Sequence, residues 1–201
     1  MHEAVQAGAE PRFIVSMLTE RGERSRSHGI RRELLAAQAA AVGLPIRFGA
    51  ATWADYREEF VRVAGEGVAE IGARAGVFGD IDIGEHREWE EDVCAELGVA
   101  AVLPLWLRDR GAVTEQLLSA GFQALIVAVR DGALPPELLG RTLDADSLAE
   151  IKAAGADACG ENGEFHTFVL DGPIFERPVE VIAGEKSLRD GVWFLDLSPS
   201  R

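Results

Sequence analysis

Residues 115–129, EQLLSAGFQALIVAV, contain the pattern that decides the fold. A helix-patterned segment comes first, then Gly121, then the apolar run ALIVAV. Glycine often ends a helix because it adopts the left-handed conformation without strain. The run after it is too short to form another helix. This stretch therefore predicts a helix, its glycine cap and a strand.

The same pattern recurs in the segments 3–18, 34–48, 68–81, 89–106 and 148–160, which predicts alternating helices and strands. Runs such as FIVSML and ALIVAV are apolar throughout, which is typical of strands covered on both faces in a parallel sheet. We therefore expect an α/β fold, an open doubly wound mostly parallel sheet flanked by helices. The chain after residue 176 predicts a small C-terminal β hairpin instead.

Length and composition favour a single domain covering residues 1–201, with 47% hydrophobic and 27% charged residues. No apolar stretch approaches the roughly 18 residues that a membrane span needs, and the first residues do not resemble a leader peptide. The formal charge of -14 argues against nucleic acid as the main partner. Two cysteines far apart in sequence fit a reducing compartment. We expect a cytoplasmic protein that binds neither membranes nor nucleic acids.

Polar side chains gather where the predicted strands end. In an open parallel sheet, ligands bind outside the carboxyl ends of the strands. The expected exits include 16–28, 78–92, 104–111 and 159–167, whereas the opposite edge carries mainly Ala, Gly, Leu and Val. We expect these loops to converge into one cleft.

The exit at residues 78–92 offers Asp80 directly after a strand, with Gly79 allowing a ligand to approach closely. Acidic residues in the first turn of a helix also simply suit the helix dipole. A metal site formed by Asp80, Asp82 and His86 is a weaker alternative, because their spacing matches no strong ligand motif. A metal-dependent hydrolase, the weakest functional hypothesis, would use the Asp80 region together with residues 161–166.

Two other strand exits contain candidate functional side chains. Trp106 could stack on a planar ring, or it could be part of the core. In the segment CGENGEFHT, His166 titrates near neutrality and nearby carboxylates could orient or deprotonate an amine. Cys159 beside them is more simply a small space-filling residue than a nucleophile. The segment 21–32 holds five arginines, which suit either a small anionic ligand or a solvated loop.

The block GENGEFHTFVLDGPIF, with GVFGDI, REWEEDVCAELGVAAVLPLW, GFQALIVAV and LLGRTLD, closely resembles the diphthine-ammonia ligase family. That family is part of the PP-loop ATP pyrophosphatases, which have a Rossmann-like nucleotide α-hydrolase fold. The resemblance runs from about Met1 to Phe175. It implies an AMP-forming amide ligase that uses ATP and Mg²⁺, adenylates a carboxylate and lets ammonia displace AMP. The acceptor carboxylate is open and could be carried by a protein, and the chain could form a homo-oligomer.

The resemblance also implies roles for individual residues. One set would receive the adenine, ribose and α-phosphate of ATP: Ser16, Met17, Leu18, His28, Gly79 and Asp80. A second set would act on the acceptor or ammonia, with Glu164 or His166 as the base: Glu161, Asn162, Glu164 and His166. Supporting contacts would come from a third set: Arg87, Trp106, Arg141, Gly160, Gly163 and Thr167. No residue is assigned as a metal ligand.

The sequence departs from the family in one respect, because it has no SGGKDS loop to hold the ATP phosphates. The family's first strand is central, so we expect residues 1–130 to be an N-terminally truncated nucleotide-binding core whose true start lies upstream. Residues 131–201 would then form the acceptor side. The alternative is that the remaining strands close up, leaving a catalytically impaired nucleotide- or metabolite-binding protein.

Overall fold

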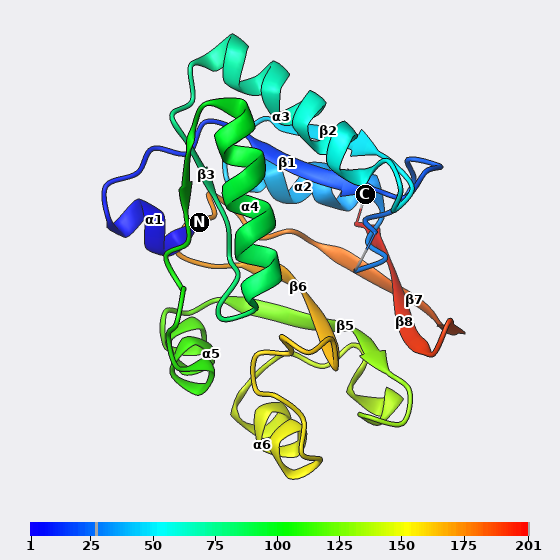
Figure 1. Ribbon diagram of the computed structural model, residues 1–201. Helices are drawn as coiled ribbons and strands as arrows, with labels where there is room; N and C mark the ends of the chain where they lie inside the picture. Colours follow the sequence, from blue (N-terminus) through cyan, green and yellow to red (C-terminus); the bar gives the residue numbers. More distant parts are fainter. Residues whose placement is uncertain (27, 201) are drawn as a thin grey trace. The chain divides into compact units, whose positions relative to one another are not determined.

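The computed structural model describes residues 1–26 and 28–200 (Figure 1). In chain order the elements are α1 (His2–Gln6), β1 (Ile14–Leu18), α2 (Arg32–Ala41), β2 (Ile46–Ala50), α3 (Tyr56–Ile71), β3 (Ala75–Val77), α4 (Gly84–Leu97), β4 (Ala100–Val102), α5 (Arg110–Ser119), β5 (Gln123–Arg130), the 3-10 helix η1 (Pro136–Leu138), α6 (Ala145–Ala153), β6 (Phe165–Asp171), β7 (Val181–Arg189) and β8 (Val192–Pro199). None of the helices in this described part combines the length and apolar character needed to cross a bilayer.

The predicted α/β class is confirmed: helices alternate with parallel strands, and an antiparallel sheet follows near the C-terminus. By packing, the chain divides into two compact units, which are described separately. Unit 1 comprises Met1–Glu23 and Leu44–Arg108, and unit 2 comprises Arg24–Gly43 and Asp109–Arg201. The single domain with an internal division at residue 130 stays a prediction.

The glycines after the helices behave as predicted. Each of the six helices α1 to α6 in the described chain is followed by a glycine with positive φ: Gly8, Gly43, Gly72, Gly98, Gly121 and Gly155. This left-handed conformation satisfies the last helical carbonyls and turns the chain toward the next element. Five of these junctions lead into a strand, and the sixth, after α6, leads into the turn that precedes β6.

Unit 1 contains two parallel ladders. β1 pairs with β2, with Ser16 opposite Phe48, and β3 pairs with β4, with Gly76 opposite Ala101. Within the described residues the two ladders are separate two-stranded sheets rather than one continuous sheet.

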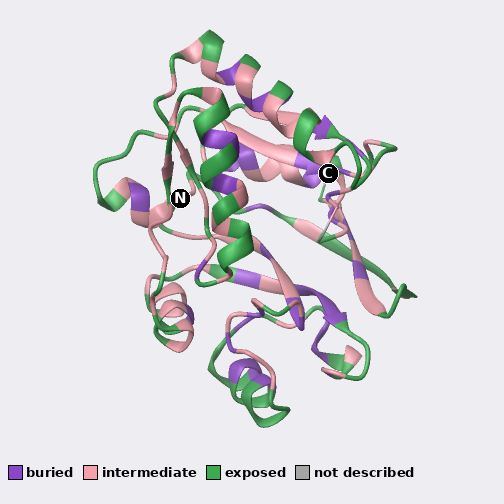
Figure 2. Cartoon of the chain, viewed as in Figure 1, coloured by how far each residue is buried: buried purple, intermediate pink, exposed green. Residues whose placement is uncertain are grey.

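Unit 2 contains a four-stranded sheet in the order β6-β5-β8-β7, in which every pair is antiparallel. The expectation that ALIVAV lies in a parallel ladder was wrong, because β5 is antiparallel to both of its neighbours. Ile126 and Val127 are both 0% exposed although successive side chains point to opposite faces (Figure 2). A continuously apolar strand thus indicates that both faces of the sheet are covered. It does not indicate whether the neighbouring strands are parallel or antiparallel.

The predicted C-terminal hairpin is confirmed and completes this sheet. β7 and β8 are joined by Asp190 and Gly191, both with positive φ, which is the geometry of the turns that match strand twist. β8 then pairs with β5. The core beneath the sheet includes Leu34 of α2 and Ile151 of α6, which are fully buried. Full burial of such a side chain stabilises the fold by about 1.5 to 3 kcal/mol.

Candidate functional site

In unit 1, the loops that follow β3 and β4 converge. The backbone N–H of Leu107 donates to the carbonyl of Ile81 at 2.7 Å, which fastens the turn after β4 to the loop after β3. Leu107 has a positive φ of 58° and a side chain that is 74% exposed, an uncommon conformation for a residue with a Cβ. The carboxyl ends of this ladder therefore carry a locally strained, fixed pair of loops.

Asp80 lies in the first of these loops. Its Oδ1 is 2.7 Å from Nδ1 of His86, in the first turn of α4. Glu90, one turn further along α4, is only 3% exposed and hydrogen-bonds to Asp80. Burial, followed by the hydrogen bond to Asp80, raises the pKa of Glu90. Gly79 has open space around its Cα, so a ligand can approach the backbone there.

Arg87 and Trp106 contact each other. The Arg87 guanidinium lies 5.1 Å from the centre of the Trp106 ring, and its Nε donates to Glu91 at 2.6 Å. Cation–π contact holds the ring and the cation together.

The β1 residues assigned to adenine and ribose are less accessible. Leu18 is 0% exposed and Met17 is 8% exposed, so only Ser16 offers a partly exposed polar side chain. The carbonyl of Leu18 accepts a hydrogen bond from the N–H of Ala51 at 3.3 Å.

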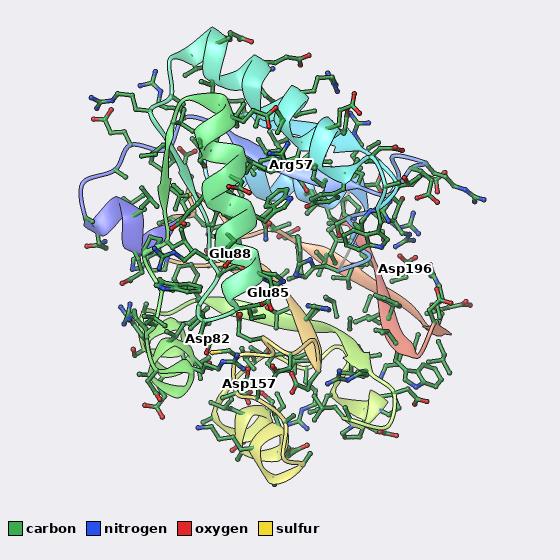
Figure 3. The ribbon with its side chains drawn as sticks, viewed as in Figure 1. Arg57, Asp82, Glu85, Glu88, Asp157 and Asp196 are labelled. Atoms are coloured by element: carbon green, nitrogen blue, oxygen red, sulfur yellow. The ribbon has the colours of Figure 1, made fainter. Side chains whose placement is uncertain are left out.

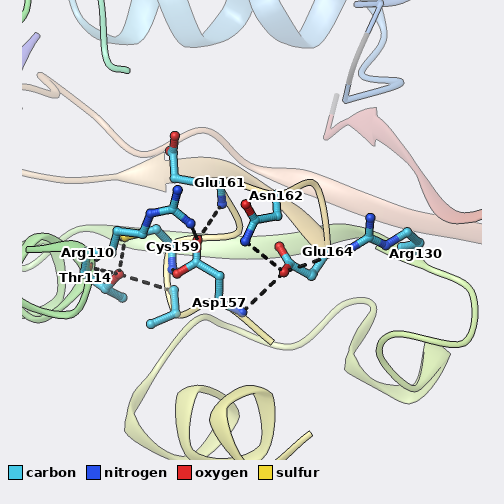
Figure 4. A network of polar contacts seen from close by, with 9 residues as sticks. Arg110, Thr114, Arg130, Asp157, Cys159, Glu161, Asn162 and Glu164 are labelled. Atoms are coloured by element: carbon cyan, nitrogen blue, oxygen red, sulfur yellow. Dashed lines mark hydrogen bonds and ion pairs between the residues drawn. The ribbon is translucent and has the colours of Figure 1, made fainter. Parts of the chain in front are cut away.

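In unit 2, the turn that carries GENGE is built around Asp157 (Figure 4). Its Oδ2 accepts from Arg110 at 2.6 Å and from the N–H of Glu161 at 3.0 Å, and its Oδ1 accepts from the N–H of Cys159 at 3.2 Å. Gly160 and Gly163 have φ of 70° and 75°, the left-handed conformations that such a tight turn requires.

Glu164 ends this turn and is 8% exposed. Its Oε1 accepts weakly from Asn162 Nδ2 at 3.3 Å and from the Asp157 N–H at 3.4 Å, and Arg130 Nη2 lies 3.9 Å away. No donor reaches the buried Oε2 within the described residues. A buried acceptor without a partner costs about 1 to 3 kcal/mol.

His166 follows on β6, opposite Ala128 of β5, and Thr167 is opposite Ile126. The His166 ring meets the His28 ring edge to face, with centroids 4.7 Å apart. Desolvation lowers the pKa of His166, so its imidazole is neutral at pH 7 and can accept a proton.

Arg141 and Cys159 have other partners. Arg141 Nη1 forms an ion pair with Glu150 at 2.7 Å on the surface. The Cys159 thiol donates to the carbonyl of Arg110 at 2.7 Å and lies 3.0 Å from the Thr114 hydroxyl, and burial raises its pKa. These contacts fit the space-filling interpretation of Cys159 rather than a nucleophile. Both cysteines are free thiols, and Cys94 is buried.

The structure thus groups Gly79, Asp80, Arg87 and Trp106 in unit 1, and Glu161, Asn162, Glu164, His166 and His28 in unit 2. Comparison with known families bears on both groups. Residues 1–101 match the model of the diphthamide synthase N-terminal domain, and residues 109–198 match that of the diphthamide synthase C-terminal domain.

The chain belongs to the diphthamide synthase family.

Curated relatives agree with this family. The chain is 36% identical to the diphthine-ammonia ligase of Homo sapiens over 99 residues, which are 47% of the chain and 37% of that relative. It is 34% identical to the Danio rerio enzyme over 99 residues, 47% of the chain and 39% of the relative. For Schizosaccharomyces pombe the identity is 32% over 97 residues, 47% of the chain and 16% of the relative. The chain therefore spans less than two fifths of the length of each.

Two residues of this diphthamide synthase chain escaped the sequence-based assignment. Asp157 organises the GENGE turn, although it precedes the motif, and nothing in its local sequence marks it. Glu90 carried a usable signal: it shares helical spacing with Val93 and Cys94, both buried, so it lies on the buried side of α4. A carboxyl at such a position is either paired or protonated.

The expected Mg²⁺ has no evident protein site. Within residues 1–26 and 28–200, no group of three or more His, Cys, Asp or Glu side chains is arranged to hold a metal ion. The side chains present therefore do not fit a dedicated metal site, and no step below is routed through Mg²⁺.

Proposed function

We propose that this chain is an ATP-dependent, AMP-forming amide ligase that adenylates a carboxylate for attack by ammonia. The observation that carries the proposal is the match of both halves to one diphthamide synthase family, together with relatives named diphthine-ammonia ligase. The acceptor is a carboxylate that we leave open, including one carried by a protein. AMP is a better leaving group than hydroxide, which is why adenylation lowers the barrier to amide formation.

We assign ATP binding to unit 1, with Ser16 to Leu18 beside the base and ribose and Gly79 and Asp80 near the α-phosphate. The parallel ladder supports this assignment, because ligands bind at the carboxyl ends of such strands. The open space around Gly79 and the fixed loops after β3 and β4 agree with it. Arg87 and Trp106 support the phosphate side.

We assign the acceptor and ammonia to unit 2. Glu164 offers a buried carboxylate oxygen that no donor within residues 1–26 and 28–200 satisfies, which suits an ammonium ion with its N–H donors. The neutral imidazole of His166, two residues after Glu164, can remove the proton that converts ammonium to ammonia. Glu161, Asn162, Gly160, Gly163 and Thr167 shape this region, with Arg141 as a supporting contact.

The decisive experiment measures AMP and pyrophosphate release from ATP, with ammonium and candidate carboxylate acceptors present. We expect pyrophosphate to be released when the acceptor is adenylated, and AMP to be released only when ammonium is also present. Nucleotide binding without either product would favour the alternative, a catalytically impaired nucleotide- or metabolite-binding protein.

A paired variant tests the ammonia assignment. Glu164→Gln removes the anionic oxygen, and we expect the KM for ammonium to rise about 10-fold or more while ATP binding is retained, since a hydrogen bond to a charged group is worth about 1.5 to 3 kcal/mol. Glu185→Gln, on the exposed strand β7, is the matched control and should leave both unchanged. An unchanged ammonium KM in Glu164→Gln would rule out this role.

A further inference from the structure

His86, Asp80 and Glu90 form a connected triad inside unit 1. Asp80 follows β3, while His86 and Glu90 are four residues apart on α4 and so share one face of the helix. His86 Nδ1 and Asp80 Oδ1 are 2.7 Å apart, and Glu90 hydrogen-bonds to the same aspartate. Figure 3 shows Glu85 and Glu88 on this helix and Asp82 just before it.

The position of the protons follows from burial. Glu90 is 3% exposed and no donor in the described chain reaches its Oε2, so an ionised carboxylate would be unsatisfied there. Desolvation, then Asp80 and the charge of Glu91, raise the pKa of Glu90. Glu90 therefore keeps its proton and donates a hydrogen bond to Asp80, whose side chain is 28% exposed.

The imidazole tautomer is then fixed. A carboxylate that already accepts from Glu90 has no proton to give, so His86 Nδ1 must be the donor in the contact with Asp80. The lone pair of His86 is left on Nε2. The His86 side chain is 56% exposed, so this nitrogen can reach a ligand.

We propose that His86 is a proton-accepting catalytic residue, oriented by Asp80, and that Glu90 is a positioning residue that stabilises the charge of Asp80. The ligand class is a nucleophile with an N–H or O–H bond. The same logic of an imidazole held by a buried carboxylate underlies general-base catalysis in hydrolases.

The identity of the nucleophile rests on the proposed function. In that reaction the nitrogen of ammonia forms a bond to the acyl carbon and the carbon–oxygen bond to AMP breaks, with its electron pair leaving on AMP. The nitrogen must lose one proton to become a neutral amide. His86 Nε2 takes that proton and later releases it to water.

Nitrogen NMR of the histidine rings tests the triad without any assay of activity. In the wild-type chain at neutral pH we expect His86 to carry its proton on Nδ1, the opposite of the tautomer that free histidine prefers. Asp80→Asn should return His86 to the Nε2–H tautomer, while the signal of His2 stays unchanged. A wild-type His86 protonated on Nε2 would overturn the proposal.

The variant Glu90→Gln tests whether Glu90 acts as a hydrogen-bond donor to Asp80 or as a base. Glutamine keeps an N–H donor for Asp80, so we expect this variant to preserve the His86 tautomer. Glu88→Gln, an exposed change on the same helix, is the matched control and should keep the wild-type spectrum. If Glu90→Gln abolishes the Nδ1–H tautomer, Glu90 is not the donor that we propose.

The kinetic test measures the rate of amide formation, after ligase activity has been demonstrated. His86→Gln and Asp80→Asn should slow amide formation about 100-fold or more and remove the limb of the pH profile that reports a base. Release of pyrophosphate in the adenylation step should persist in His86→Gln. Asp80→Asn does not make this separation, because Asp80 is also assigned to the ATP site. If the NMR result holds and no ligase activity is found, the proposed function fails, but the arrangement of His86 and Asp80 is still supported. Normal amide formation in His86→Gln would overturn the catalytic role of His86.

Discussion

Gly160 and Gly163 both lie in the GENGE turn with positive φ, but their surroundings differ. A Cβ at Gly160 would lie 2.7 Å from the carbonyl oxygen of Phe165, whereas a Cβ at Gly163 would meet nothing within 4 Å. Gly163→Ala should therefore cost only the backbone strain, about 1 kcal/mol. Gly160→Ala should cost at least about 1 kcal/mol more, because backbone rather than a flexible side chain must shift. Urea unfolding of the two variants measures the difference, and equal losses would contradict it.

Glu90 makes stability depend on pH at a single residue. Its pKa in the folded chain is raised above its ordinary value of 4.5, chiefly by burial. The stabilisation from the protonated form is fully present below pH 4.5 and is lost as the pH rises through the folded pKa. Glu90→Gln cannot ionise, so its unfolding free energy should fall less between pH 5 and pH 8, by about 1 kcal/mol or more.

Urea unfolding at those two pH values, with Glu88→Gln as the control, measures this effect. The control should keep the wild-type dependence on pH, because Glu88 is exposed. Identical pH dependence in wild type and Glu90→Gln would show that Glu90 is ionised in the folded chain.

At the scale of elements, Asp196 ties β8 to the N-terminal end of α2. Arg31 donates to it at 2.5 and 3.1 Å and Arg24 at 2.8 Å, so this part of the arginine-rich segment is occupied by a carboxylate within unit 2. These hydrogen bonds, that of Arg31 first, lower the pKa of Asp196 to about 2. The arginines thus explain part of a pattern that the sequence left open between a ligand site and a solvated loop.

Asp196→Asn should destabilise unit 2 by about 1 kcal/mol at pH 7, since the side chains are partly exposed and water screens the pair. The contribution is present above the ordinary pKa of 3.8 and is lost as the pH falls through about 2. Thermal unfolding between pH 2 and pH 7 measures it, with the exposed Glu180→Gln as the control. A variant whose acid sensitivity equals that of the wild type would refute the prediction.

At the scale of the whole molecule, the formal charge of -14 sets the field that any anionic ligand meets. Added salt screens repulsion between like charges, so ATP affinity should stay level or rise with salt, unlike the steep loss seen at basic binding sites. Equilibrium binding of ATP at low and high salt tests this, with uncharged adenosine as the control. A marked fall in ATP affinity with salt, absent for adenosine, would show that a local basic site dominates.

The sequence by itself determined where helices end and turns form, and to which family the chain belongs. Glycines after each helix, the Asp190–Gly191 turn and the GENGE turn are set by local backbone preferences, which a short window contains. The tertiary structure alone decided the rest: the antiparallel pairing of β5, the contacts of Asp157 and the burial that protonates Glu90 and leaves Glu164 Oε2 without a donor. Strand direction and desolvation depend on residues distant in sequence, and no local pattern records which of them the fold brings together.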